Sequence, residues 1–190
     1  MLELRSSLRD YNKALTHAID SIDCVLLEDV IELLRENIVC ESIFIIGNGG
    51  NASTASHIAC DLQKGLWQNI ETSWSNVSSL SDNIALFTAW ANDYDFESVY
   101  SRQLEQIATE GDILIALSAS GNSHNIVHAV GQAILMNIDT IGISGFNSTP
   151  LSRKVKYPII IESEDMQIIE DATLIIGHFI FKELSRRIAQ

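Results

Sequence analysis

The sequence predicts an α/β fold in which a parallel sheet is covered by helices on both faces. Short apolar runs bounded by glycine or serine alternate along the chain with longer segments whose apolar residues recur at helical spacing. This alternation is typical of parallel sheets, because a crossover helix must separate consecutive strands. The 190 residues can form one sizeable core, and no linker or repeat divides them. We therefore expect a single domain over residues 1–190.

The elements follow from these patterns in chain order. Apolar residues at helical spacing predict two helices before residue 41, and the apolar run at 42–46 predicts the first strand. Further strands are expected at 76–80, 112–118, 140–144 and 157–161. Further helices are expected at 52–66, 83–91, 96–108, 123–136 and 165–187.

The charge balance argues against nucleic acid as a partner. The formal net charge is −13, and the 12 Lys and Arg residues are scattered rather than gathered in a basic stripe. No apolar stretch is long enough to span a bilayer, and the N-terminus lacks a signal-peptide pattern. Cys24, Cys40 and Cys60 are odd in number and lack metal-ligand spacing. We expect them to be small core residues in a reducing cytoplasm.

The first strand runs into a glycine-rich turn, Gly47-Asn48-Gly49-Gly50-Asn51, at the start of a predicted helix. Glycines at this junction expose backbone amides, and a helix N-terminus behind them favours an anion such as phosphate. The spacing matches neither the Rossmann nor the Walker pattern. A plain glycine turn with an Asn cap is the alternative interpretation.

A second junction, Ser118-Ala119-Ser120-Gly121-Asn122-Ser123, follows the strand at 112–118. Hydroxyls donate to phosphate oxygens without adding charge, and Ser123 could also cap the next helix. Open α/β sheets bind ligands beyond the carboxyl ends of their strands. Two such junctions therefore predict a phosphate-binding crevice at that edge of the sheet.

Two pairs of ionisable residues carry the remaining chemistry. His57 and Asp61 are four residues apart on one predicted helix, so they share a face. Glu170 and His178 are eight residues apart on the last helix, which is about two turns. Two imidazoles and two carboxylates suit zinc or proton transfer. Spacing alone does not bring the two helices together, so ordinary surface residues remain an alternative.

The motifs together resemble the sugar isomerase (SIS) domain and, more narrowly, bacterial phosphoheptose isomerases. The resemblance covers nearly the whole chain, in order. Beyond the two junctions it rests on Ala91-Asn92-Asp93-Tyr94, Phe96, Tyr100-Ser101-Arg102 and Gly111-Asp112. It implies a three-layer αβα sandwich with a five-stranded parallel sheet, similar to flavodoxin. It also implies a homotetramer whose N-terminal helical pair, residues 1–40, packs at subunit interfaces.

The resemblance also implies roles for individual residues. Ser118, Ser120 and Ser123 would hold a phosphate, and Asp93 would lie near sugar hydroxyls. The site would be lined further by Asn48, Gly49, Gly50, Asn51, Ala119 and Glu170. One zinc ion per subunit would be held by His57, Asp61, Glu170 and His178. Asp61 and His178 would also transfer protons.

Four residues depart from the pattern of this family. Asp61 stands where the family has Glu, and Glu170 stands where it has Gln. Asn51 replaces a Ser, and Ala119 replaces a Thr, so each removes a hydroxyl. The two-His, two-carboxylate set is kept, with more negative charge.

The expected reaction is the conversion of sedoheptulose 7-phosphate to D-glycero-D-manno-heptose 7-phosphate, an aldose–ketose isomerisation through an enediol. This step leads to nucleotide-activated heptose for lipopolysaccharide or capsule. Asp61 is the first candidate base, with Glu170 as a substitute. Two rivals remain: an isomerase of another sugar phosphate, and a non-catalytic SIS protein that binds a replication initiator or senses a phosphosugar. Asp61 together with His178 favours an enzyme.

Overall fold

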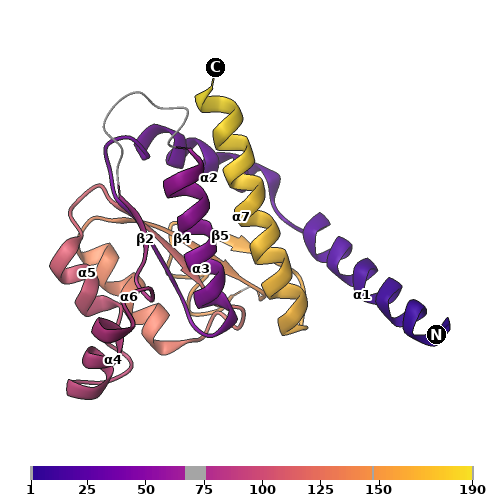
Figure 1. Ribbon diagram of the computed structural model, residues 1–190, viewed down its shortest axis with the longest axis horizontal. Helices are drawn as coiled ribbons and strands as arrows, with labels where there is room; N and C mark the ends of the chain where they lie inside the picture. Colours follow the sequence, from indigo (N-terminus) through magenta and orange to yellow (C-terminus); the bar gives the residue numbers. More distant parts are fainter. Residues whose placement is uncertain (1, 67–75, 147, 190) are drawn as a thin grey trace.

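A computed structural model describes residues 2–66, 76–146 and 148–189 of the chain (Figure 1). Its centre is one sheet of five parallel strands in the order β2-β1-β3-β4-β5. The strands are β1 (Ile43–Gly47), β2 (Val77–Ser79), β3 (Ile113–Leu117), β4 (Asp139–Ser144) and β5 (Tyr157–Ile160). The five-stranded parallel sheet of the sequence prediction is therefore confirmed.

Helices lie on both sides of this sheet and complete the three layers (Figure 1). They are α1 (Leu2–Asp20), α2 (Cys24–Asn37), α3 (Gly50–Cys60), α4 (Ile84–Asp93), α5 (Ser101–Ile107), α6 (His124–Leu135) and α7 (Met166–Ile188). A π-helical segment, η1 (Asp61–Gly65), continues α3. None of the helices in the described ranges is long and apolar enough to cross a membrane.

Side chains alternate along each strand, so the sheet separates two apolar cores. In β1, Ile43 and Ile45 join the core beneath α2, α3 and α7. Phe44 and Ile46 join the core beneath α5 and α6. All five residues of β1 are buried, which explains why the strand is a continuous apolar run rather than an alternating one.

Two predicted helices differ in detail from the observed ones. The helix expected at 52–66 changes to π geometry at Asp61. The helix expected at 96–108 begins only at Ser101, because the Asp95 carboxylate accepts a hydrogen bond from the Ser98 amide at 2.7 Å and holds a turn before it.

The expectation that the cysteines are core residues is wrong, because Cys24, Cys40 and Cys60 are all exposed. Cys24 is the first residue of α2, Cys60 is the last of α3, and Cys40 lies in the turn after α2. Their surroundings are set by which side of each element faces the sheet, and composition does not carry that information.

Helix α1 extends away from the body of the molecule (Figure 1). Near its C-terminal end Ala18 is buried, whereas Leu4 and Leu8 near its start are 75% and 68% exposed. Apolar side chains on a projecting helix are typical of a surface that another protein chain covers.

Candidate functional site

The carboxyl ends of β1 and β3 lie side by side, because Gly47 pairs in register with Leu117. The loops after these two strands therefore meet, as predicted. Their junction is closed by a reciprocal amide pair: Asn48 Nδ2 donates to Asn125 Oδ1 at 2.8 Å, and Asn125 Nδ2 donates to Asn48 Oδ1 at 2.9 Å. Asn125, in the first turn of α6, is 2% exposed and Asn48 is half-buried, so this pair fixes the first loop to the helix that follows the second loop.

The first loop depends on glycine and on a buried tyrosine. Gly49 has a φ of +57°, a conformation that residues with a side chain rarely adopt. The hydroxyl of Tyr100 donates to the carbonyl of Gly47 at the end of β1. Burial raises the pKa of Tyr100 to about 12, so the hydroxyl keeps the proton that this hydrogen bond needs. The tyrosine thus fixes the place where the chain leaves the sheet.

The second loop presents hydroxyl groups around Gly121, which has a φ of +62°. Ser118 Oγ donates to Ser123 Oγ at 3.2 Å, and Ser120 Oγ accepts from the Asn122 amide at 3.3 Å. Ser123 is the N-cap of α6, but its side chain makes no capping hydrogen bond. Its hydroxyl is therefore available to a ligand rather than used by the helix.

One pocket, called the loop pocket below, lies between the two loops and the first turns of α7. It is lined by Asn48, Asn51, Leu117, Ser118, Ala119, Ser120, Ser123, Met166 and Glu170. Seven of the substrate-binding residues expected from the sequence are thus brought together.

The other three expected substrate-binding residues lie outside this lining. Gly49 lines a neighbouring hollow with Phe87 and Tyr100. Gly50 packs against Glu170, whose Oε2 lies 2.6 Å from the point where a Cβ on Gly50 would stand. Asp93 is exposed at the end of α4, where its carboxylate accepts a hydrogen bond from Asn92.

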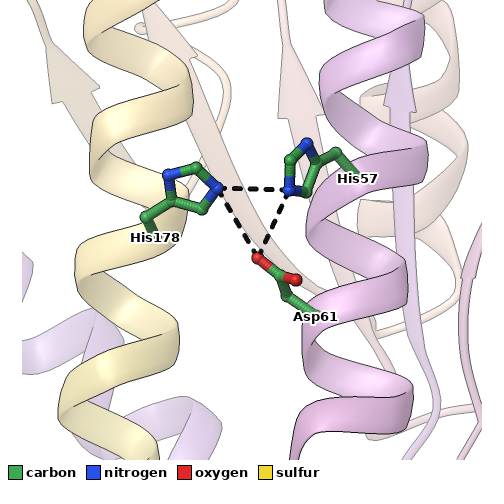
Figure 2. Close-up of side chains that lie close together, drawn as sticks. All are labelled: His57, Asp61 and His178. Atoms are coloured by element: carbon green, nitrogen blue, oxygen red, sulfur yellow. Dashed lines mark hydrogen bonds and ion pairs between the residues drawn. The ribbon is translucent and has the colours of Figure 1, made fainter.

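Three ionisable side chains from two helices form a second feature, called the His–Asp cluster below (Figure 2). His57 Nε2 lies 3.2 Å from His178 Nε2. Asp61 Oδ2 lies 3.6 Å from His57 Nε2 and 3.7 Å from His178 Nε2. The resemblance implied that these three side chains meet, and in the structure they do.

The cluster has the geometry of a metal site. Ligands around a tetrahedral zinc ion at about 2.0–2.1 Å stand roughly 3.3 Å apart. The three separations of 3.2, 3.6 and 3.7 Å are close to that value. Two imidazoles and one carboxylate are a donor set that zinc accepts, and three protein ligands leave one position open. The residues present therefore fit the metal that the sequence suggests.

Close packing of α3 and α7 brings the cluster together. A Cβ on Gly177 would lie 2.6 Å from Ile58 Cδ1, and a Cβ on Gly65 would lie 2.6 Å from two atoms of the Phe181 ring. Gly50 packs against Glu170 in the same way. The three contacts follow one another in the same order along the α3–η1 segment and along α7. The helices thus run side by side in one direction (Figure 1). Asp61 begins the π-helical segment, a geometry that is frequent at functional sites.

Glu170 is not among the side chains that meet in the His–Asp cluster. It lies two turns before His178 on α7, roughly 12 Å along the axis. Gly50 likewise precedes His57 by about 10 Å along α3. The side chains that meet in the His–Asp cluster are those of His57, Asp61 and His178, whereas Glu170 lines the loop pocket.

Sequence reasoning missed Asn125 and the role of Tyr100. An Asn in the first turn of a predicted helix is typical of capping, so Asn125 gave no separate signal. Tyr100 enters the sequence argument only through the resemblance, since nothing in the local pattern indicates which strand end would supply the hydrogen-bond partner that a buried tyrosine needs.

Comparison with known proteins places these features in context. Residues 12–145 match the SIS domain family. A phosphoheptose isomerase from Crocosphaera subtropica is 34% identical over 166 residues, which are 87% of this chain and 84% of that protein. A phosphoheptose isomerase from Helicobacter pylori is 31% identical over 180 residues, covering 94% of this chain and 92% of its own.

Solved structures share the fold. A phosphoheptose isomerase from Neisseria gonorrhoeae superposes with a TM-score of 0.86 at 23% identity, covering 98% of this chain and all of that one. The Vibrio vulnificus NanR protein, solved in complex with ManNAc-6P, superposes with a TM-score of 0.68 at 18% identity, covering 98% of this chain and 66% of its own.

Proposed function

The chain belongs to the SIS domain family and, within it, to the phosphoheptose isomerases, and from this membership we propose that it converts sedoheptulose 7-phosphate to D-glycero-D-manno-heptose 7-phosphate. The observation that carries the proposal is the His–Asp cluster, which lies roughly 10–12 Å from the loop pocket along α3 and α7. A ligand held by its phosphate in the loop pocket reaches the cluster with the other end of an extended sugar chain.

In this proposal the loop pocket binds the phosphate. Ser118, Ser120 and Ser123 donate hydroxyl hydrogen bonds to its oxygens, with Asn51 beside them. The N-terminus of α6 directly behind Ser123 adds the favourable end of a helix dipole. Asp93 accepts from sugar hydroxyls, as the resemblance implies.

Proton transfer belongs to the other end of the ligand. Asp61 removes the proton from the carbon beside the carbonyl, and His178 returns a proton to the neighbouring carbon. Both side chains are partly exposed, at 28% for Asp61 and 42% for His178, so a substrate can reach them. Glu170, the substitute base expected from the sequence, lines the loop pocket.

The proposed cofactor is one zinc ion per subunit, held by His57, Asp61 and His178. Zinc held by these residues would supply a Lewis acid for the substrate carbonyl. The protein's own contribution is to hold the two imidazoles and the carboxylate at ligand spacing before the metal arrives.

The test is a coupled assay with sedoheptulose 7-phosphate on enzyme stripped by a chelator, with and without added zinc. We expect turnover to need zinc and to fall about 10²–10⁴-fold in Asp61→Asn and in His178→Ala. Asp29→Asn and His17→Ala make the same chemical changes at exposed positions on α2 and α1 and should keep full activity. Full turnover in both site variants would overturn the assignment of roles.

A homotetramer and a cytoplasmic location complete the proposal. The exposed Leu4 and Leu8 on the projecting α1 support assembly through the N-terminal helices. Light scattering should give a mass near four chains, and a Leu4→Glu, Leu8→Glu double variant should give a smaller particle. Binding of the sugar phosphate without turnover in any condition would instead favour a non-catalytic phosphosugar sensor.

A further inference from the structure

The side-chain amide of Asn125 is oriented by the backbone of its own helix. The N–H of Ile126, a fully buried residue, donates to Asn125 Oδ1 at 3.0 Å. Because a backbone N–H can only donate, the atom that faces it must be the oxygen of the Asn125 amide. The nitrogen of that amide is the atom left to donate, and it donates to Asn48 Oδ1 at 2.9 Å.

The same orientation is passed on to Asn48 in the first loop. Asn125 Oδ1 also accepts from Asn48 Nδ2 at 2.8 Å, so each amide supplies one donor and one acceptor to the other. A flipped Asn48 amide would place oxygen against oxygen and nitrogen against nitrogen, and both hydrogen bonds would be lost. The backbone at the start of α6 therefore determines which way the Asn48 amide points.

Only one member of this pair can touch a ligand. Asn48 lines the loop pocket, whereas Asn125 is 2% exposed and is not among the described residues that line this pocket or the hollow beside Gly49. An amide nitrogen carries two N–H groups, and the pair with Asn125 uses one of those of Asn48. The second N–H of Asn48 can therefore be donated to a molecule in the loop pocket.

We infer that Asn125 is a positioning residue of the loop pocket, which holds the Asn48 amide so that an N–H group rather than the carbonyl oxygen meets the phosphate of the ligand. The inference rests on the proposed phosphate-binding role of this pocket. Phosphate oxygens are negatively charged acceptors, so they gain from a fixed N–H donor, whereas an amide oxygen offers them no hydrogen bond. A donor that is oriented beforehand also loses less conformational freedom when the ligand binds.

A double-mutant cycle on Asn48 and Asn125 tests this inference. The measurement is the Kd of sedoheptulose 7-phosphate for the chelator-stripped protein, by isothermal titration calorimetry. We expect Asn125→Ala to raise this Kd roughly tenfold or more, because the affected contact is a hydrogen bond to a charged group. In the Asn48→Ala background the same substitution should change Kd by less than about twofold, since the side chain that Asn125 positions is already gone.

Asn125→Asp repeats the cycle with a side chain of nearly the same shape. It keeps an acceptor for the Ile126 amide, which Asn125→Ala leaves unpaired, so it tests the inference even if Asn125→Ala does not fold. Its added charge acts on the ligand in both backgrounds and therefore cancels in the cycle. The control is Asn37→Ala, which removes an amide hydrogen bond to the Leu33 carbonyl at the end of α2 and should keep the wild-type Kd.

Three outcomes would overturn the inference. Both Asn125 variants could leave Kd unchanged, or they could raise it equally with and without the Asn48 side chain. In either case the phosphate site stands, but Asn125 does not act through Asn48. If neither sedoheptulose 7-phosphate nor glycerol 3-phosphate binds to the wild-type protein, the loop pocket is not a phosphate site and the inference falls with it.

Discussion

Hydroxyl groups rather than cations surround the proposed phosphate position. The loop after β3 offers Ser118, Ser120 and Ser123, and the described lining of the pocket includes no Lys or Arg. Such a site depends on geometry more than on net charge, which suits a chain with a formal charge of −13. Losing one hydroxyl should therefore weaken binding without changing the chemistry at the other end of the substrate.

Ser123→Ala tests this at a single residue. Hydrogen bonds to charged groups contribute about 1.5–3 kcal/mol, so we expect KM for the sugar phosphate to rise roughly 10–100-fold with little change in kcat. Stability should hardly change, because the Ser123 side chain does not cap α6. Ser6→Ala, at an exposed position on α1, is the control for the kinetic comparison. An unchanged KM would remove Ser123 from the phosphate site.

At this scale the sequence identified most side chains but not their grouping. Serines around one glycine at a strand end predicted a cluster of hydroxyl groups, and Ser118, Ser120 and Ser123 do line one pocket; their role in holding a phosphate stays a prediction. Spacing on one helix grouped Glu170 with His178; in the structure His178 meets His57 and Asp61, and Glu170 lines the loop pocket. Asn125, which joins the loops, was not recognised, since its partner Asn48 is 77 residues away.

Two parallel helices, α3 and α7, determine whether the His–Asp cluster exists at all. The two helices come close at glycines, which have no side chain to hold them apart. Gly177 directly precedes His178 and packs against Ile58, the neighbour of His57. Ile58 is 4% exposed, so it has little room to move away. A methyl group at position 177 should separate the two imidazoles.

Gly177→Ala should therefore weaken zinc binding and lower stability. The overpacking costs about 1–3 kcal/mol, which exceeds the gain of about 1 kcal/mol in helix propensity. In the matched control, Gly131→Ala on α6, the added Cβ meets only the flexible end of Lys154 at 2.9 Å, so the propensity gain should dominate. Urea unfolding and a zinc titration measure both effects. Equal zinc affinity in the two variants would contradict the inference that the contact of Gly177 with Ile58 sets the spacing of the two imidazoles.

Elements were easier to predict than their details. Strands buried on both faces are continuous apolar runs, and all five were found within one or two residues of their observed bounds. The change to π geometry at Asp61 and the late start of α5 were not predicted. Both depend on individual contacts, such as the Asp95 turn, which no periodicity reports.

On the scale of the whole molecule, Arg187 fastens the C-terminal helix to α2. It contacts Glu28 at 2.6 Å and Glu32 at 2.5 Å across 159 and 155 residues of sequence. The Arg187 guanidinium holds the pKa of Glu28 below its ordinary value of 4.5. A group with a lowered pKa in the folded state stabilises the protein above its unfolded pKa, and this contribution is lost as the pH falls through the folded pKa.

We therefore expect wild-type stability to fall from pH 7 to pH 3.5 by more than that of Arg187→Gln. The difference should be modest, because exposed ion pairs contribute little and are screened by salt. Urea midpoints at the two pH values provide the measurement, repeated with Arg153→Gln, whose guanidinium donates to a backbone carbonyl and not to a carboxylate. An equal change in urea midpoint between the two pH values for all three proteins would show that the ion pairs of Arg187 with Glu28 and Glu32 do not stabilise the protein.

The amide pair between Asn48 and Asn125 has a consequence for the thermodynamics of binding. Two flexible loops that are not connected to each other must both become ordered when a ligand binds, and the conformational entropy lost on ordering reduces the affinity. Here two part-buried hydrogen bonds already join the first loop to the helix after the second loop, so both loops are held in place before a ligand binds. The heat-capacity change of binding then reports the burial of the ligand itself, with little contribution from a folding loop.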